Sequence, residues 1–296
     1  MAALGQDSAT AQAGRDDFLA GWREIIVNPA TPSIARVYDY WLGGNHNLVA
    51  DRQVAETMAT LDPWIPAACR ANRAFLGRAV RYLAGQGIRQ FLDIGSGIPT
   101  AGNVHEVAQQ VAPDARVVYV DRDPVAVAES EYLLAASQHT AVVQADIRDP
   151  QAIVSHPVVR QQLDFSEPVA IMLVAVLHFV LDTDGPHGIV ARLRDAVVPG
   201  SHLVVSHATS HGNAALAAAA ERIYNSRAAD GHARSREEIA RFFGDWEMAD
   251  PGLVYAPQWR PGSPADVPGH PERFWFLTGA ARKQDQAGAS SRAVRP

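Results

Sequence analysis

Lysine is almost absent from this chain of 296 residues, which holds 26 lysines and arginines together but only one lysine, Lys283. A phosphate-binding P-loop needs a lysine beside its glycines, and a pyridoxal enzyme needs one for its Schiff base. Reductases that use a tyrosine–lysine pair need that lysine in the core, whereas Lys283 falls in a polar stretch late in the sequence. All three classes therefore lack their key residue here.

Cysteine, long apolar runs and excess positive charge are scarce as well. Cys69 is the single cysteine, which excludes a disulfide framework and a cysteine-based metal site. No run approaches the roughly 20 apolar residues that span a bilayer, and no apolar signal segment is seen, so we expect a cytoplasmic protein without a membrane partner. A net charge of −6 argues against nucleic acid as a partner. His207 and His211 have no acid or cysteine nearby in sequence, so no metal site is predicted.

What is present is a glycine turn between a strand and a helix. The apolar run Ile88–Ile94, with Asp93 near its end, is typical of a buried strand. Gly95 and Gly97 follow at once, and a helical pattern begins near Ala101. Glycines allow a tight turn and let a ligand approach without a Cβ in the way. This order of elements predicts the start of a nucleotide-binding βαβ unit.

Three successive strands are expected to end in a carboxylate. Asp93 closes the first, Asp121 ends the strand Arg116–Asp121, and Asp146 follows the strand Ala141–Ala145. One such acid could simply cap a helix. An acid roughly 20 residues or more past the glycine turn is instead placed to bind a ribose diol. Three in succession indicate a nucleoside ligand.

The pattern Asp93-x-Gly95-x-Gly97 resembles motif I of the Rossmann-like methyltransferases that use S-adenosylmethionine. Thr100 occupies the third glycine position of a dinucleotide fingerprint, which argues against a nicotinamide-dependent reductase. The chain also resembles a bacterial family labelled S-adenosyl methyltransferase, from about Pro32 to Arg282. The stretches that carry this resemblance are 32–44, 87–100, 103–108 and 174–179.

The predicted fold class is α/β: a Rossmann-like, doubly wound, mostly parallel seven-stranded sheet with an N-terminal helical extension. We expect the extension or lid over 15–84, the S-adenosylmethionine-binding domain over 85–282, and a disordered tail over 283–296. Beyond the first three strands, the expected strands are Pro168–Leu177, His202–His207, Trp246–Tyr255 interrupted by Pro251 and Gly252, and Arg273–Gly279.

The extension is expected to hold four helices. One spans Phe18 to Ile26, a second is capped by Ser33 and ends at Gly43, and the others run from about Leu48 to Thr60 and Pro66 to Ala84. Residues 33–52 could close over the cofactor as a lid. Alternatively Tyr38 and Trp41 are core, and Arg52 pairs with Glu56 rather than with the cofactor's carboxylate. The arginines Arg70, Arg73, Arg78 and Arg81 are interpreted as a solvated helix face.

The resemblance and the strand ends together predict the site residues. Asp93, Gly95 and Gly97 should lie by the methionine part of the cofactor, Asp121 by the ribose, and Asp146 with Ile147 by the adenine. His178 either lines the pocket or acts as a general base, which makes it the candidate catalytic residue. The full set expected to bind the cofactor is Tyr38, Asn45, Asn47, Arg52, Asp93, Gly95, Ser96, Gly97, Asp121, Arg122, Asp146, Ile147, His178 and Phe179.

The predicted function is transfer of the methyl group of S-adenosylmethionine to a small-molecule acceptor, with S-adenosylhomocysteine as product. The sulfonium already makes the methyl group electrophilic, so the protein has to supply orientation. The alternative is a protein that binds the cofactor without transferase activity, because its motifs would look the same. The sequence leaves the acceptor, the methylated atom and the oligomeric state open.

Overall fold

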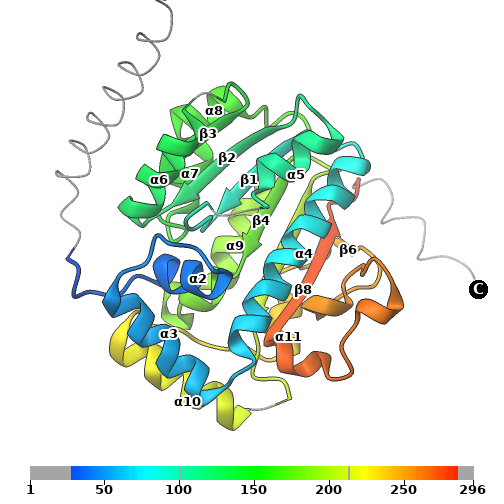
Figure 1. Ribbon diagram of the computed structural model, residues 1–296. Helices are drawn as coiled ribbons and strands as arrows, with labels where there is room; N and C mark the ends of the chain where they lie inside the picture. The colour runs from blue at the N-terminus through cyan, green and yellow to red at the C-terminus, as the bar shows by residue number, and fades with distance from the viewer. Residues whose placement is uncertain (1–27, 100–101, 136, 213, 286–296) are drawn as a thin grey trace, which may run out of the picture.

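A computed structural model describes residues 28–99, 102–135, 137–212 and 214–285. The helix expected from Phe18 to Ile26 lies outside the described residues. The described chain forms one eight-stranded sheet in the order β3-β2-β1-β4-β5-β8-β6, with β7 paired to β8 (Figure 1). This confirms the expected α/β, Rossmann-like class.

Five strands are parallel: β1 (Gln90–Ile94), β2 (Arg116–Asp121), β3 (Thr140–Gln144), β4 (Ala170–Val174) and β5 (His202–Ala208). The other three are antiparallel: β8 (Phe276–Arg282) pairs with β5, and the short β6 (Glu247–Met248) and β7 (Val254–Tyr255) pair with β8. Seven strands were expected. The eighth arises because the segment holding Pro251 and Gly252 divides the predicted strand into β6 and β7.

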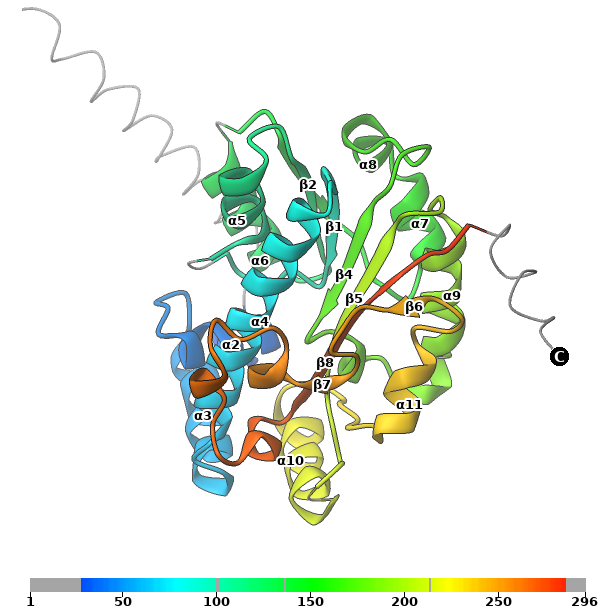
Figure 2. The same cartoon turned by 90° about the vertical axis from the view of Figure 1, so that its right-hand side faces the viewer.

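Helices cover both faces of the sheet (Figure 2). Successive strand residues point to opposite faces, and in β1 Phe91 packs into one core while Leu92 packs into the other. On the Phe91 face lie α4 (Ile65–Gly85) and α5 (Val104–Val111). On the Leu92 face lie α7 (Pro150–Ser155), α8 (Pro157–Gln162), α9 (Pro186–Asp195) and α11 (Arg236–Arg241). The remaining helix beside this sheet, α6 (Pro124–Leu134), begins directly after β2.

The other helices gather near the carboxyl ends of the parallel strands: α2 (Ile34–Leu42), α3 (Val49–Leu61) and α10 (Ala214–Arg227) (Figure 1). Trp41 of α2 belongs to the same buried core as Phe75 of α4 and Phe91 of β1. Arg227 of α10 donates a hydrogen bond to the Thr57 hydroxyl of α3 at 3.0 Å. These helices are thus fastened to the sheet and to each other.

Two local details differ from expectation. The helix expected near Ala101 begins at Val104, after Gly102 has taken a positive φ of 76° and Asn103 has formed the N-cap. Lys283, which was expected in a disordered tail, donates hydrogen bonds to the carbonyls of Arg194 and Val197 at 3.0 and 2.8 Å. Among the described residues, no helix is long and apolar enough to cross a membrane.

Candidate functional site

A cavity of about 790 Å³ lies at the carboxyl ends of β1 to β4, where open α/β sheets bind their ligands. Its walls come from the turn after β1, the ends of β2 and β3, the segment 174–180 after β4, and the segment 31–42 that includes α2. The chain places β2 and β3 on one side of β1 and β4 on the other. The loops after β1 and β4 therefore diverge and leave room for this cavity.

Most of the predicted site residues line this one cavity. They are Tyr38, Asp93, Gly95, Ser96, Gly97, Asp121, Arg122, Asp146, Ile147, His178 and Phe179. Sequence reasoning missed several lining residues, among them Ser33, Arg36, Asp39, Asn72, Arg73 and Asp123.

Asn45, Asn47 and Arg52 do not line the cavity, contrary to expectation. Arg52 donates to the carbonyl and the side-chain oxygen of Asn47, both at 3.0 Å, so it pairs with neither a cavity group nor Glu56. Asn47 in turn donates to the buried Asp39 carboxylate at 2.9 Å. A Cβ at Gly44 would lie 1.9 Å from Asp39, so only glycine allows this close turn. These residues therefore shape the loop after α2.

The two glycines of the turn after β1 have different surroundings. Both have positive φ, 74° at Gly95 and 67° at Gly97. A Cβ at Gly95 would lie 2.3 Å from the Val176 side chain, so glycine is needed there for packing against the segment after β4. A Cβ at Gly97 would meet no heavy atom within 4 Å. Of the two positions, only Gly97 offers the open approach expected of a glycine beside a ligand.

Asp121 fastens the turn after β1 to the end of β2. Its Oδ2 accepts the backbone N–H of Gly97 at 2.7 Å, and its Oδ1 accepts the N–H of Asp123 at 2.9 Å. Burial raises the pKa of this carboxyl group, and these hydrogen bonds oppose the rise. Each carboxylate oxygen keeps a lone pair for a ligand hydroxyl.

Asp93 and Arg73 both lie in the cavity wall, and no ion pair joins their side chains. Asp93 is 6% exposed, and burial raises its pKa to about 7 although Arg73 lowers it. Among the described residues, neither side chain has a hydrogen-bond or ion-pair partner, and both line the cavity. A buried carboxyl group and a guanidinium without such partners complement the ammonium and the carboxylate of an amino acid.

The solvated helix face expected on α4 was therefore wrong for two of its four arginines. Arg73 faces the cavity, and Arg78 donates to the carbonyls of Trp259 and Ala256 at 2.8 and 2.7 Å. The sequence did hold a signal. Arg73 stands at helical spacing from the buried Leu76, Val80 and Leu83, and so lies on the buried face of α4.

Asp146 lies at the rim of the cavity. Burial would raise its pKa, but the hydrogen bonds from the Arg148 side chain and backbone outweigh it, so that the pKa of Asp146 is lowered. The Arg122 guanidinium lies 3.9 Å from the same Asp146 Oδ2 that Arg148 contacts. The carboxylate is therefore charged and held by Arg148 at the end of β3.

His178 follows β4 in a short 3-10 turn, Leu177–Phe179. Burial, helped by the nearby charge of Arg234, lowers its pKa to about 3. Its Nδ1 is buried without a hydrogen-bond partner among the described residues. The imidazole is therefore neutral at ordinary pH. No cluster of potential metal ligands occurs in the described parts of the chain.

Arg234, which does not line the cavity, holds the turn that contains His178. Its side chain is 1% exposed and donates to the carbonyls of Leu177 and Val180 at 3.0 and 2.8 Å. Its Nη1 also lies 2.9 Å from Nε2 of His207, so that His207 is hydrogen-bonded within the core. The position of His178 consequently depends on a guanidinium that does not line the cavity.

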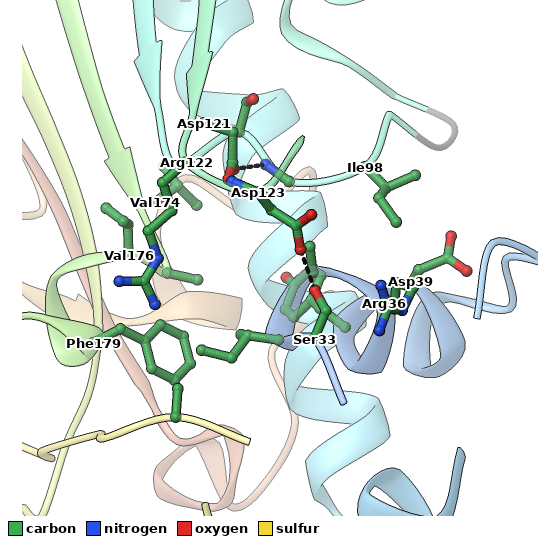
Figure 3. Close-up of a pocket in the computed structure, with 18 of the residues that line it drawn as sticks. Ser33, Arg36, Asp39, Ile98, Asp121, Arg122, Asp123, Val174, Val176 and Phe179 are labelled. Atoms are coloured by element: carbon green, nitrogen blue, oxygen red, sulfur yellow. Dashed lines mark hydrogen bonds between the residues drawn. The ribbon is translucent and has the colours of Figure 1, made fainter. Parts of the chain in front are cut away.

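Ser33 closes the cavity from the other side. It holds the N-cap position of α2, yet its hydroxyl donates to Oδ2 of Asp123 rather than capping the helix (Figure 3). Its backbone N–H donates to the fully buried Asp51 at 2.8 Å, and Arg36 donates to the same carboxylate at 2.7 Å. The start of α2 is thus fixed to the end of β2 and to α3.

A doubly wound sheet whose cavity combines a glycine turn, acidic strand ends and an unpaired Asp–Arg couple defines a protein that binds a nucleoside joined to an amino acid. A family model described as S-adenosyl methyltransferase matches residues 21–284. The chain belongs to this family, and it is a methyltransferase that uses S-adenosylmethionine. The family predicted from the sequence is thereby confirmed.

Two solved structures are similar over most of their length. A Thermobifida fusca protein assigned as a methyltransferase is 45% identical, covers 86% of this chain and 96% of its own, and has a TM-score of 0.83. A DUF574 family protein from Streptomyces avermitilis is 41% identical, covers 86% and 98%, and has a TM-score of 0.82. No curated protein sequence matches the chain.

Proposed function

We propose that the chain methylates a small molecule bound beside the carboxyl end of β4, with the cofactor held across the ends of β1 to β3. The observation that carries this proposal is the pair of Asp93 and Arg73, which face the cavity without partners among the described residues, next to the open space at Gly97. When bound, S-adenosylmethionine supplies an electrophilic methyl group on a sulfonium. Everything else falls to the protein's own groups.

The first task of these groups is to fix the amino-acid end of the cofactor. Asp93 would accept from the ammonium, and the Arg73 guanidinium would donate to the carboxylate. Gly97 lets the ligand lie directly on the backbone, because no side chain occupies the space above it. Arg73 thus takes the role that the sequence suggested for Arg52.

The nucleoside end is held over β2 and β3. Asp121 accepts from a ribose hydroxyl with the lone pairs that Gly97 and Asp123 leave free. Asp146 and Ile147 border the adenine end at the rim, and Ile147 is a buried apolar residue against which a flat base can pack. Arg122 lies beside Asp146 and adds positive charge at this end.

His178 and Phe179 face the acceptor. A histidine whose pKa is lowered to about 3 holds a proton poorly, so His178 orients the acceptor by a hydrogen bond and does not act as the general base. We also propose that residues 33–52 cover the cofactor, with the bond from Ser33 to Asp123 as the fastening.

The test has two parts. Calorimetry should show binding of S-adenosylhomocysteine to the purified chain, and incubation with methyl-labelled S-adenosylmethionine and a metabolite extract should transfer label to a small molecule. Binding without any transfer would favour the alternative of a cofactor-binding protein without activity. Absence of binding would overturn the assignment of the cavity.

A further inference from the structure

A second, smaller cavity of about 80 Å³ adjoins the first on the side away from β3. The two share the side chains of Trp41, Cys69, His178, Phe179, Tyr224 and Phe276. Ala208, the last residue of β5, and Phe276, the first residue of β8, pair with each other at this end of the sheet. We call the space bounded by the six shared side chains the aromatic chamber. The carboxylates expected to hold the cofactor, Asp93, Asp121 and Asp146, are not among the six shared side chains, whereas His178 and Phe179, which were also expected to bind it, are.

The aromatic chamber is apolar, and its ionisable side chains are uncharged. Burial lowers the pKa of His178 to about 3 and raises the pKa values of Cys69 and Tyr224 well above neutrality. Arg234 and Arg70 act on the pKa values of His178 and Cys69, but neither guanidinium lines either cavity. Glu221 lines the far side of the smaller cavity, where its carboxylate lies 3.4 Å from Nδ1 of His232. Glu221 also accepts the backbone N–H of Ala233 at 2.6 Å. An ionised ligand would lose its hydration here without gaining a counter-ion.

Aromatic rings dominate the walls. The centroid of Phe179 lies 4.2 Å from that of His178 and 5.9 Å from that of Tyr224. Tyr224 meets Trp41 edge to face at 6.5 Å, and Phe276 lies 6.0 Å from His178. Phe179 and Tyr224 are only partly buried. Such half-covered rings offer edge and face contacts to another planar ring.

Three buried polar atoms of residues that line the larger cavity lack partners within the part of the chain that the structure describes: Oδ1 of Asp39, Oδ1 of Asn72 and Nδ1 of His178. Asn72 donates to the Tyr38 hydroxyl at 3.0 Å, and that hydroxyl donates to the Cys69 carbonyl at 3.0 Å. This series of bonds orients the Asn72 amide, whose oxygen is left as a buried, unpartnered acceptor. The Nδ1 of His178 is in the same condition. Of these atoms, only Nδ1 of His178 belongs to the aromatic chamber, and it is suited to a ligand that brings a hydrogen-bond donor.

We infer that the methyl acceptor is an uncharged, planar aromatic molecule with a hydroxyl or N–H group, its ring held in the aromatic chamber and its donor turned toward His178. As the methyl group leaves the sulfonium, the positive charge passes to the acceptor oxygen or nitrogen, which then loses its proton to water. The inference rests on the proposed function, since it assigns the acceptor to the same site. It excludes ionised amines and carboxylates as acceptors.

The test uses protein saturated with S-adenosylhomocysteine and three probes of similar size and different charge: 1-naphthol, 1-naphthoate and 1-naphthylmethylamine. Calorimetry should show that 1-naphthol binds at least about tenfold more tightly than either charged probe. Equal or tighter binding of a charged probe, or no binding of 1-naphthol, would overturn the inference. Failure of S-adenosylhomocysteine to bind would instead count against the proposed function.

Variants then locate the probe. Phe179→Ala and Tyr224→Ala should each weaken 1-naphthol binding about tenfold and lower the affinity for S-adenosylhomocysteine much less, although both residues also line the larger cavity. Tyr132→Ala is the matched control, because Tyr132 is 48% exposed on α6 and does not line either cavity. Phe179→Leu keeps the apolar bulk without the ring and serves if an alanine variant unfolds. A parallel loss of both affinities, or no loss of 1-naphthol binding, would contradict the assignment.

Discussion

Gly97 donates its backbone N–H to Oδ2 of Asp121 at 2.7 Å, which joins the turn after β1 to the end of β2. The same carboxylate accepts the N–H of Asp123. Asp121 therefore shapes the floor of the cavity as well as presenting lone pairs to a ribose. A change at this residue should affect the turn and the ligand together.

Asp121→Asn tests this double role. The amide keeps one acceptor oxygen but turns an NH2 group toward a backbone N–H, so one hydrogen bond is lost and donors face each other. We expect the affinity for S-adenosylhomocysteine to fall by about 1–3 kcal/mol in calorimetry. Asp114→Asn is the control, because Asp114 is 75% exposed and does not line the cavity. An unchanged affinity in Asp121→Asn would remove Asp121 from the site.

Gly95→Ala and Gly97→Ala should have different effects. Both place an alanine at positive φ, but only the Cβ at residue 95 meets Val176, at 2.3 Å. We expect Gly95→Ala to lower the free energy of unfolding by about 1–3 kcal/mol more than Gly97→Ala in urea titrations. Gly97→Ala should mainly weaken cofactor binding, because its Cβ enters the open space.

Gly102→Ala controls for backbone strain in this comparison. Gly102 also has positive φ, a Cβ there would meet no heavy atom within 4 Å, and the residue does not line the cavity. Equal unfolding free energies for the variants at residues 95 and 102 would show that contact with Val176 is unimportant.

Arg73→Gln should weaken binding of S-adenosylhomocysteine by about 10- to 100-fold, because a charge-assisted pair with the carboxylate becomes a neutral contact. The matched control is Arg81→Gln on the same helix, since Arg81 is exposed and outside the cavity. Arg52→Gln should change affinity less than Arg73→Gln, because Arg52 bonds to Asn47. The reverse order would restore Arg52 as the partner of the carboxylate.

The elevated pKa of Asp93 makes stability depend on pH. Unfolded, this carboxyl group has a pKa near 3.9, whereas folded it titrates at about 7. Between these values the folded state binds the proton more tightly, so the contribution of Asp93 to the free energy of unfolding falls as pH rises and levels off above about 7. Compared with Asp93→Asn, the natural chain should lose about 2 kcal/mol between about pH 5 and pH 7 in urea titrations. Parallel pH profiles of the two proteins would contradict this.

Ser33→Ala removes the hydroxyl that reaches Asp123. If the segment 33–52 covers the cofactor, S-adenosylhomocysteine should dissociate about tenfold faster from this variant, with a smaller change in association rate. Stopped-flow fluorescence of the complex measures both rates. Ser166→Ala is the control, because Ser166 bonds to the exposed Asp164 and does not line the cavity. Identical dissociation rates would leave the segment a fixed wall and not a cover.

The strand ends of the site could be predicted from the sequence, because the apolar pattern of a buried strand and the glycine turn after it are both local in sequence. Asp93, Asp121 and Asp146 were predicted at three strand ends, and all three line one cavity. The parallel pairing of β1 with β2 and of β2 with β3 brings the same ends together. Here the two-residue period of strands and the glycine turn were sufficient.

The α2–α3 region was less predictable because its contacts are distant in sequence. Asn47 and Arg52 looked like ligand-binding residues, but the buried Asp39 holds the loop that contains them. Ser33 looked like a helix cap, yet its hydroxyl reaches Asp123, 90 residues further on. Neither outcome follows from local pattern, since each depends on how helices pack on the sheet. The position of Arg73, in contrast, could have been inferred from the helical spacing of Leu76 and Val80.

The antiparallel pairing of β8 with β5 has a consequence for the order in which the site is synthesised. Because β8 runs against β5, its first residue, Phe276, pairs with the last residue of β5 and reaches the carboxyl edge of the sheet. The ribosome delivers Asp93, Asp121 and Asp146 long before Phe276. The carboxylates at the ends of β1 to β3 are therefore synthesised before the last wall of the aromatic chamber, which stays open on one side until β8 pairs with β5. A chain that ends before β8 thus contains every strand-end carboxylate of the site but lacks Phe276, one of the six side chains of the aromatic chamber.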